Sequence, residues 1–366
     1  MNIFSLVYKI NWLFIFLLIL VSSLGVGLLY SIAGGEWNPW ALNQIIRILI
    51  GVLLLLFAAS INIKIWYKNS YYIYFFCIFL ILITLFFSRE ISGATRWLDL
   101  YFFSMQPAEI LKIFVILTLA KYFHSIKLQS FDIKHRILFP LLILLLPVTL
   151  VFKQPDLGTA LIIFFSGIVV FFLAGVKAKV FLGAGILGTI SMPVLWSFLK
   201  DYQKSRIINF LDQQSDVLGA NYHITQSKIS LGSGGLFGKG FLQGTQSHLS
   251  FVPEMQTDFI FSVLGEEFGF FGIFMLFIIY AIIMFWAIRI CLNSRNYFSK
   301  IFGISFISSF FLSIFVNVGM VTGIIPVVGV PLPLCSYGGS AMISYFIGFG
   351  ILLSGYNFRD NKLENI

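Results

Sequence analysis

Runs of about 18 apolar residues or more recur along the whole chain, separated by short polar connections. A helix of this length crosses roughly 30 Å of hydrocarbon. We therefore expect about ten transmembrane helices, at residues 12–33, 44–63, 71–88, 107–123, 137–152, 157–175, 180–199, 258–288, 301–322 and 338–356. The eighth is the longest, so it either tilts or begins outside the hydrocarbon. The pattern predicts an all-α polytopic membrane protein, with residues 1–366 forming a single transmembrane domain.

A polar segment at residues 200–257 interrupts this pattern between the seventh and eighth predicted helices. Its glycines lie at positions 232, 234, 235, 238, 240 and 244. Glycine at this density permits tight turns and close approach of the backbone to a ligand. Loops of this length are usually functional or disordered, and the aromatic and aliphatic residues of this loop favour order.

The distribution of Lys and Arg predicts the orientation, because short cytoplasmic loops carry an excess of both. With the N-terminus in the cytoplasm, most basic residues of the short loops, Lys64 and Lys121 among them, fall on the cytoplasmic side. The short outer loops then hold Arg89, Arg96 and Lys153. An even number of helices places both termini in the cytoplasm and the large loop, residues 200–257, on the extracytoplasmic side.

Composition agrees with a membrane protein and argues against several other functions. Of the 366 residues, 59% are hydrophobic and only 11% are charged, which is far less charge than a soluble domain carries. The net charge of +9 does not indicate nucleic-acid binding, because the basic residues lie in short loops between spans. The three cysteines have no metal-ligand or disulfide spacing, and no Walker loop or dinucleotide fingerprint is present.

Charged residues also occur at the starts of apolar helices, where they are expensive. Glu109 and Lys112 are three residues apart and therefore share one helical face. They form either a structural ion pair or part of a polar substrate cavity, since an unpaired charge in lipid costs roughly 3 kcal/mol. Asp156 either caps the sixth helix or belongs to the same cavity. Arg47, in the second helix, is expected to snorkel to a membrane face.

Asp258 closes the long loop and begins the eighth helix. A carboxylate at the edge of a membrane is a poor structural choice unless it binds something or does chemistry. Between the ninth and tenth helices, Pro326, Pro331 and Pro333 break any helix. Irregular backbone at membrane depth is tolerated only inside protein or beside a water-filled cavity. We predict a re-entrant loop that lines a site, with a plain outer loop as the alternative.

Several long motifs resemble the SEDS family of bacterial shape, elongation, division and sporulation proteins. They lie at residues 93–100, 106–109, 154–160, 205–240, 244–247, 253–254, 257–261 and 331–333. The resemblance covers nearly the whole chain and is closer to the elongation branch than to the division branch. Ala108 stands where the family usually has Ser, and Met255-Gln256 replaces a commoner pair that ends in His. Neither departure removes a carboxylate.

The resemblance implies a peptidoglycan glycosyltransferase of the bacterial cytoplasmic (inner) membrane, with its active site on the extracytoplasmic face. The substrate would be lipid II, an undecaprenyl-pyrophosphate disaccharide-pentapeptide, added to the nascent glycan. The product would be a β-1,4-linked glycan chain for cell-wall elongation and rod shape. The expected partner is a class B penicillin-binding transpeptidase. A lipid II flippase, or a non-catalytic scaffold for that transpeptidase, are the alternatives.

The resemblance also gives Asp258 the role of general base in an inverting transfer. Glu109, Lys112 and Asp156 are further substrate-binding candidates. The leaving pyrophosphate needs positive charge, for which the candidates are Lys112, Arg206, Lys228, Lys239 and Arg96. No cofactor is firmly implied, and a divalent cation, Mg²⁺ or Mn²⁺, is a further option.

Overall fold

The computed structural model describes residues 11–87, 96–100, 103–126, 137–198, 204, 208, 222–245, 254–360 and 363. Within them lie eleven helices: α2 (Trp12–Ile32), α3 (Ala41–Ser60), α4 (Ile63–Phe87), α5 (Pro107–Ser125), α6 (Phe139–Lys153), α7 (Leu157–Leu173), α8 (Ala178–Phe198), α10 (Tyr222–Ser233), α12 (Ile260–Leu292), α13 (Tyr297–Thr322) and α14 (Gly339–Asn357). A short antiparallel hairpin joins β1 (Leu98–Leu100) to β2 (Phe103–Met105). The predicted all-α fold is confirmed apart from this hairpin, and each of the ten predicted spans coincides with a helix.

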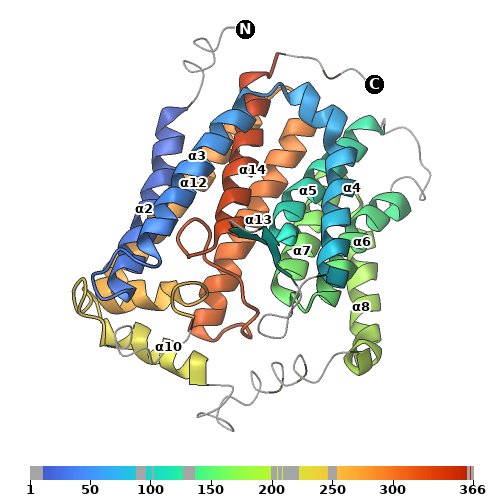
Figure 1. Ribbon diagram of the computed structural model, residues 1–366. Coiled ribbons are helices and arrows are strands. Elements are labelled where there is room, and N and C mark those ends of the chain that lie inside the picture. Colours follow the sequence, from blue (N-terminus) through green and yellow to red (C-terminus); the bar gives the residue numbers. More distant parts are fainter. Residues whose placement is uncertain are drawn as a thin grey trace.

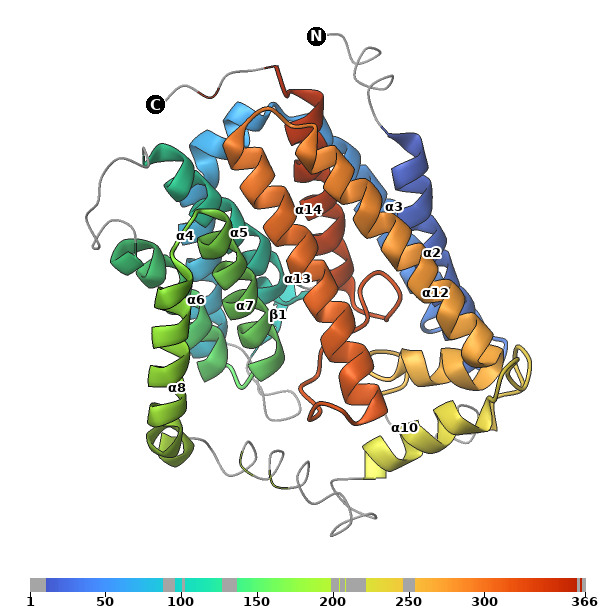
Figure 2. The ribbon, with the colours of Figure 1, turned by 180° about the vertical axis from the view of Figure 1, so that it is seen from behind.

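The bundle presents apolar side chains outward and keeps many polar side chains inside. Among the described helices, six are long and apolar enough to cross a membrane: α2, α3, α4, α12, α13 and α14. Helices α13 and α14 lie near the centre (Figures 1 and 2), where Ser305, Ser309 and Ser313 of α13 are buried. Phe57 and Phe86, by contrast, are exposed on the outside. Lipid is as apolar as these side chains, so small and polar residues stabilise helix contacts in such a bundle.

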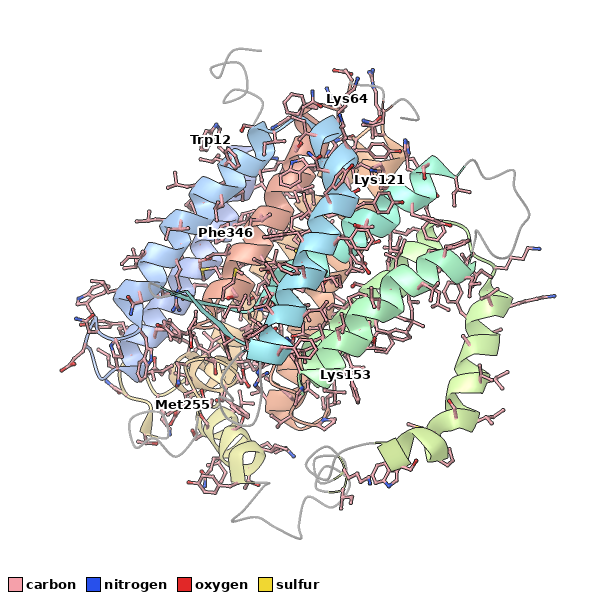
Figure 3. The ribbon with its side chains drawn as sticks, turned by 45° about the vertical axis from the view of Figure 1, so that its right-hand side comes forward. Trp12, Lys64, Lys121, Lys153, Met255 and Phe346 are labelled. Carbon is pink, nitrogen blue, oxygen red and sulfur yellow. The ribbon has the colours of Figure 1, made fainter. Side chains whose placement is uncertain are left out.

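Residues of the predicted inner and outer loops lie at opposite ends of the bundle. Figure 3 shows Lys64 and Lys121 at one end, and Lys153 and Met255 at the opposite end. Helix α2 begins, and α14 ends, at the same end of the bundle (Figure 1). The described chain therefore enters and leaves the bundle at one end.

Residues 324–338, between α13 and α14, form a re-entrant loop that folds back into the bundle (Figure 1). Its side chains Val328, Val330, Leu332, Leu334 and Cys335 are buried. Helices of the bundle satisfy its backbone carbonyls, because Tyr280 donates to Pro333 at 2.6 Å and Gln44 donates to Ser336 at 3.0 Å. Such partners make irregular backbone tolerable at membrane depth. The predicted re-entrant loop is confirmed, and the alternative of a plain outer loop is wrong.

Helix α12 is long because it is two helical segments joined at a kink. Gly269 has φ 64° and ψ −162°, a conformation that only glycine adopts readily. The first segment, residues 260–268, runs across the end of the bundle, and the second, residues 270–292, rises through it (Figure 2). The span is expected either to tilt or to begin outside the hydrocarbon. Its first turns point away from the direction of the rest of the helix, and the kink at Gly269 causes this change.

Helix α10 lies beneath α12 at the same end (Figures 1 and 2). It belongs to the polar segment at residues 200–257, so the expectation of order in that loop is confirmed for its described part. Helix α8 stands at the edge of the bundle (Figures 2 and 3), where side chains such as Leu187 and Ile190 are exposed.

Candidate active site

Asp258 lies in a turn that ends the long loop, two residues before α12 begins. Its amide N–H donates to the carbonyl oxygen of Glu254 at 3.1 Å. Its own carbonyl accepts from Asn317 Nδ2 at 2.9 Å, and Asn317 Nδ2 also donates to the carbonyl oxygen of Val330 at 2.7 Å. Asn317 is completely buried in α13. One amide side chain therefore ties the backbone of Asp258 to the re-entrant loop.

The re-entrant loop also passes close to the half-buried carboxylate of Asp258. A Cβ atom on Gly329 would stand 3.5 Å from Asp258 Oδ2, and Gly329 has φ +72°, in the left-handed region that favours glycine. Further along the loop, the N–H of Tyr337 donates to the carbonyl oxygen of Gln256 at 2.8 Å. These contacts join the turn that carries Asp258 to the re-entrant loop.

Arg47 of α3 borders the end of the re-entrant loop. Its Nη2 donates to the Tyr337 hydroxyl at 3.1 Å, and its guanidinium carbon lies 4.0 Å from the centre of the same ring. Its Nη1 is buried and has no hydrogen-bond partner within the described residues. The expectation that Arg47 snorkels to a membrane face is wrong, because the side chain packs inward against the loop. The signal that identifies it is a cation inside an otherwise apolar helix.

Glu109 and Lys112 form the predicted ion pair inside the bundle. Lys112 Nζ lies 2.6 Å from Glu109 Oε2, and the two residues are only 2% and 5% exposed. Lys112 Nζ also donates to the Tyr345 hydroxyl at 3.0 Å, and that hydroxyl donates to Ser313 Oγ at 2.6 Å. Burying two charges is costly unless further hydrogen bonds accompany the pair, and Tyr345 of α14 and Thr159 of α7 supply those bonds here.

Asp156 is buried and caps α7, as one of its two predicted roles requires. Its Oδ1 accepts from the N–H of Thr159 at 3.1 Å, and its Oδ2 accepts from Gln106 Nε2. Arg96 Nη1 lies 3.9 Å from Oδ1. Burial raises the pKa of Asp156, while Arg96 and the Thr159 amide act in the opposite direction. The N–H of Gln106 donates to Ser340 Oγ at 2.9 Å, which links this cluster to the start of α14.

The described cations Lys228 and Lys239 contact different parts of the bundle. Lys228 of α10 packs on Gly323, the left-handed residue that ends α13, and a Cβ there would stand 2.6 Å from its Nζ. A cation in this position complements the helix C-terminus. Lys239 binds Glu266, with Nζ 2.7 Å from Oε1. Arg206 lies outside the described residues.

A divalent cation stays a prediction. Among the residues that the structure describes, no three or more His, Cys, Asp or Glu side chains gather in a way that could hold a metal ion. Mg²⁺ is commonly held by one or two carboxylates together with substrate phosphates, so such a site does not require a cluster of this kind.

Comparisons with known proteins agree with this architecture. Residues 4–360 match the family model for cell cycle proteins of the FtsW, RodA and SpoVE type. The peptidoglycan glycosyltransferase MrdB of Escherichia coli K12 is 42% identical over 322 residues, which cover 87% of this chain and 85% of MrdB. Stage V sporulation protein E of Bacillus subtilis is 30% identical and covers 93% of this chain and 95% of its own length.

Solved structures show the same arrangement of helices. The rod shape determining protein RodA of Thermus thermophilus is 27% identical, covers 96% of this chain and 98% of its own, and has a TM-score of 0.72. A chain from a study of the structural coordination of polymerization and crosslinking by a peptidoglycan synthase complex has a TM-score of 0.83 at 28% identity, covering 96% of this chain and 99% of its own. The fold and site are those of an integral membrane protein with a carboxylate held at one end of its bundle. This chain belongs to the SEDS family, which includes FtsW, RodA and SpoVE.

Proposed function

We propose that this protein is a peptidoglycan glycosyltransferase of the inner membrane that polymerises lipid II for cell-wall elongation. Relatives of up to 42% identity over most of the chain bear the name peptidoglycan glycosyltransferase. The observation that carries the site assignment is the placement of Asp258 between the re-entrant loop and α13, with its backbone fixed by Asn317. Asp258 follows Met255 by three residues, and Met255 lies at the end of the bundle opposite Lys64 and Lys121 (Figure 3), which is the predicted extracytoplasmic end.

In this proposal Asp258 acts as a general base. It takes the proton from the 4-hydroxyl of the acceptor GlcNAc while that oxygen attacks C1 of the donor MurNAc. The bond between C1 and the phosphate oxygen breaks, undecaprenyl pyrophosphate leaves, and the lipid-linked α-anomer becomes a β-linkage. A sugar pyrophosphate is already a good leaving group, so no second carboxylic acid is needed, unlike in glycoside hydrolysis.

The leaving pyrophosphate requires positive charge, and the contacts of the candidate cations rank them. Lys112 is engaged with Glu109 and Tyr345 inside the bundle. Arg96 and Arg47 are better placed, because both adjoin segments that meet at the start of α14. Arg96 does so through the Asp156 cluster, and Arg47 through Tyr337. Two guanidinium groups bind phosphate oxygens more specifically than ammonium groups, since each presents a planar set of donors.

The relative solved in a peptidoglycan synthase complex supports an association with a crosslinking enzyme. We assign this role to a class B penicillin-binding transpeptidase, so that the glycan is crosslinked as it is made. We expect the prenyl tail of the substrate to lie against the apolar helices.

The test is polymerisation of purified lipid II by the wild type and by Asp258→Asn, each purified with its transpeptidase partner and assayed with and without Mg²⁺. Loss of a general base typically costs 10²–10⁴-fold in rate, so we expect polymer to fall by at least about a hundredfold. Asp360→Asn is the matched control, because Asp360 is an exposed acid that pairs with Arg295 on the surface. Normal polymerisation by Asp258→Asn would end the assignment.

The same variant separates the enzyme from a flippase or a scaffold. In vesicles, lipid II translocation that survives in Asp258→Asn while wild-type protein makes no polymer would favour a flippase. Partner binding without polymer in the wild type would favour a scaffold. We expect wild-type polymer, lost in Asp258→Asn, with partner binding retained in both.

A further inference from the structure

The kink in α12 leaves backbone groups that a continuous helix would have paired, and a neighbouring loop takes them. We call residues 234–240 the glycine loop. The carbonyl oxygen of Glu266 accepts from the N–H of Lys239 at 2.9 Å, and that of Glu267 accepts from Gly240 at 3.0 Å. On the other side of Gly269, the N–H groups of residues 270 and 271 donate to the carbonyls of residues 235 and 236 at 2.9 and 3.0 Å. The kink and the glycine loop therefore satisfy one another.

Glycines make this approach possible. A Cβ atom on Gly234 would stand 1.9 Å from the carbonyl oxygen of Gly265, and one on Gly238 would stand 2.1 Å from that of Glu267. A Cβ on Gly269 would stand 2.3 Å from the N atom of Gly238. Real side chains do not fit at such distances, so the backbones touch only because these positions are glycine.

An ion pair fastens the same junction. Lys239 Nζ lies 2.7 Å from Glu266 Oε1, and the Glu266 side chain is completely buried. Lys239 Nζ also donates to Thr245 Oγ1 at 2.7 Å, and Thr245 Oγ1 donates to Glu266 Oε1 at 3.2 Å. Ser230 of α10 donates to Glu266 Oε2 at 3.3 Å, and Ser31 of α2 donates to Glu267. The junction thus joins the glycine loop, α10 and α2 to one end of the first α12 segment.

Asp258 lies just before the other end of that segment. Glu266 is six residues after Ile260, the first residue of α12, which is about 9 Å along a helix. A short helix held firmly at one end sets the direction of the residues at its other end. A misplacement of about 1 Å at a reacting group can cost about a hundredfold in rate. A shift at the junction that moves Asp258 would therefore slow the proposed reaction.

We propose that the Lys239–Glu266 pair and the glycine loop are a positioning device for the carboxylate of Asp258. Lys239 acts through Glu266 and does not contact the leaving pyrophosphate. This inference rests on the proposed function, and it assigns Lys239 a role different from the one implied by family resemblance. An ion pair with a buried carboxylate is in itself weak support for stability. The position of the Lys239–Glu266 pair at the kink explains its presence better.

The first test is steady-state polymerisation by Lys239→Met, Glu266→Gln and the double variant, in complex with the partner. We expect kcat to fall by about tenfold to a hundredfold with KM for lipid II unchanged, and the double variant to be no worse than either single one. Lys239→Arg should restore most of the activity. Independent losses that multiply in the double variant, or a raised KM in Lys239→Met alone, would overturn the proposal in favour of substrate binding.

The second test compares Gly232, near the end of α10, with Gly234, the first residue of the glycine loop. Gly232 has open space around its Cβ position, whereas Gly234 meets Gly265. Gly232→Ala should retain wild-type turnover, and Gly234→Ala should lose kcat as Lys239→Met does. Equal turnover of the two variants would overturn the proposal, and this holds even if Lys239→Met does not fold.

The Asp258→Asn arm keeps the two proposals apart. If Asp258→Asn polymerises normally, the proposed function fails. If Asp258→Asn is inactive while Lys239→Met and Glu266→Gln have wild-type kcat, only the positioning role fails.

Discussion

Two aspartates precede helices at the same end of the bundle, and the structure uses them in different ways. Asp156 is 1% exposed, and its carboxylate caps α7 and binds the Gln106 side chain. Asp258 is half-buried, and Phe259 rather than Asp258 is the N-cap of α12, with no side-chain cap bond. The bonds that hold Asp258 in place include two to its backbone, from Asn317 and to Glu254. The carboxylate of Asp156 holds structure, whereas that of Asp258, the proposed general base, is carried by a backbone that other groups hold in place.

Asp258→Glu is the change that tests this contrast most strongly. It keeps the negative charge but moves the carboxylate by one methylene group, so the base no longer matches the acceptor hydroxyl. We expect turnover to fall about a hundredfold, with an unchanged midpoint of thermal unfolding. Turnover is measured as polymer formed from lipid II at saturating substrate. Near-normal turnover would show that the reaction does not depend on the position in which the surrounding backbone holds this carboxylate.

Much of the fold is predictable from the sequence, because hydrophobic runs of membrane length have few alternatives. The first helix is expected at 12–33 and observed as α2, Trp12–Ile32. The kink in α12 is not predictable in this way, since Gly269 lies inside an apolar run and its φ of 64° depends on the glycine loop, which is distant in sequence. The apolar run predicts that a helix exists. Its bend follows only from the glycine loop, which pairs with the backbone groups freed at the kink.

In the candidate site, too, local contacts are predictable from the sequence and contacts between distant residues are not. The ion pair of Glu109 and Lys112 is predictable because it is local, three residues apart on one face. The contact of Arg47 with Tyr337 is not, because these residues are 290 positions apart and meet only through the re-entrant loop. Lys239 shows the same limit, since sequence identifies the cation but not its partner Glu266.

Removing the cap gives the second test of the contrast. Asp156→Ala loses the bond to the Thr159 amide and leaves Gln106 and Arg96 without their acceptor. Losing a cap and burying unsatisfied donors together cost about 1–3 kcal/mol, so we expect a lower midpoint of thermal unfolding. Turnover per folded molecule should fall much less than in Asp258→Glu. If Asp156→Ala has the larger loss of turnover and no loss of stability, the two aspartates have been assigned the wrong way round.

The pH dependence of stability gives the third and smallest effect. Burial, more than the nearby Glu109, raises the pKa of Asp156 above its ordinary value of 3.8, although Arg96 and the Thr159 amide oppose the shift. As the pH rises from that value, the unfolded chain therefore releases this proton before the folded protein does. The folded state binds more protons in this window, so this group makes stability fall as the pH rises, until the folded-state pKa is passed.

Asp156→Asn isolates this contribution, because Asn caps a helix about as well as Asp but does not titrate. The unfolding midpoint of the variant, relative to that of the wild type, should rise as the pH is raised from about 4 and then level off. Comparing the two proteins at each pH removes the effect of the other acidic groups. A difference that stays constant across this range would mean that Asp156 titrates alike in the folded and unfolded states, and that its surroundings compensate fully for its burial.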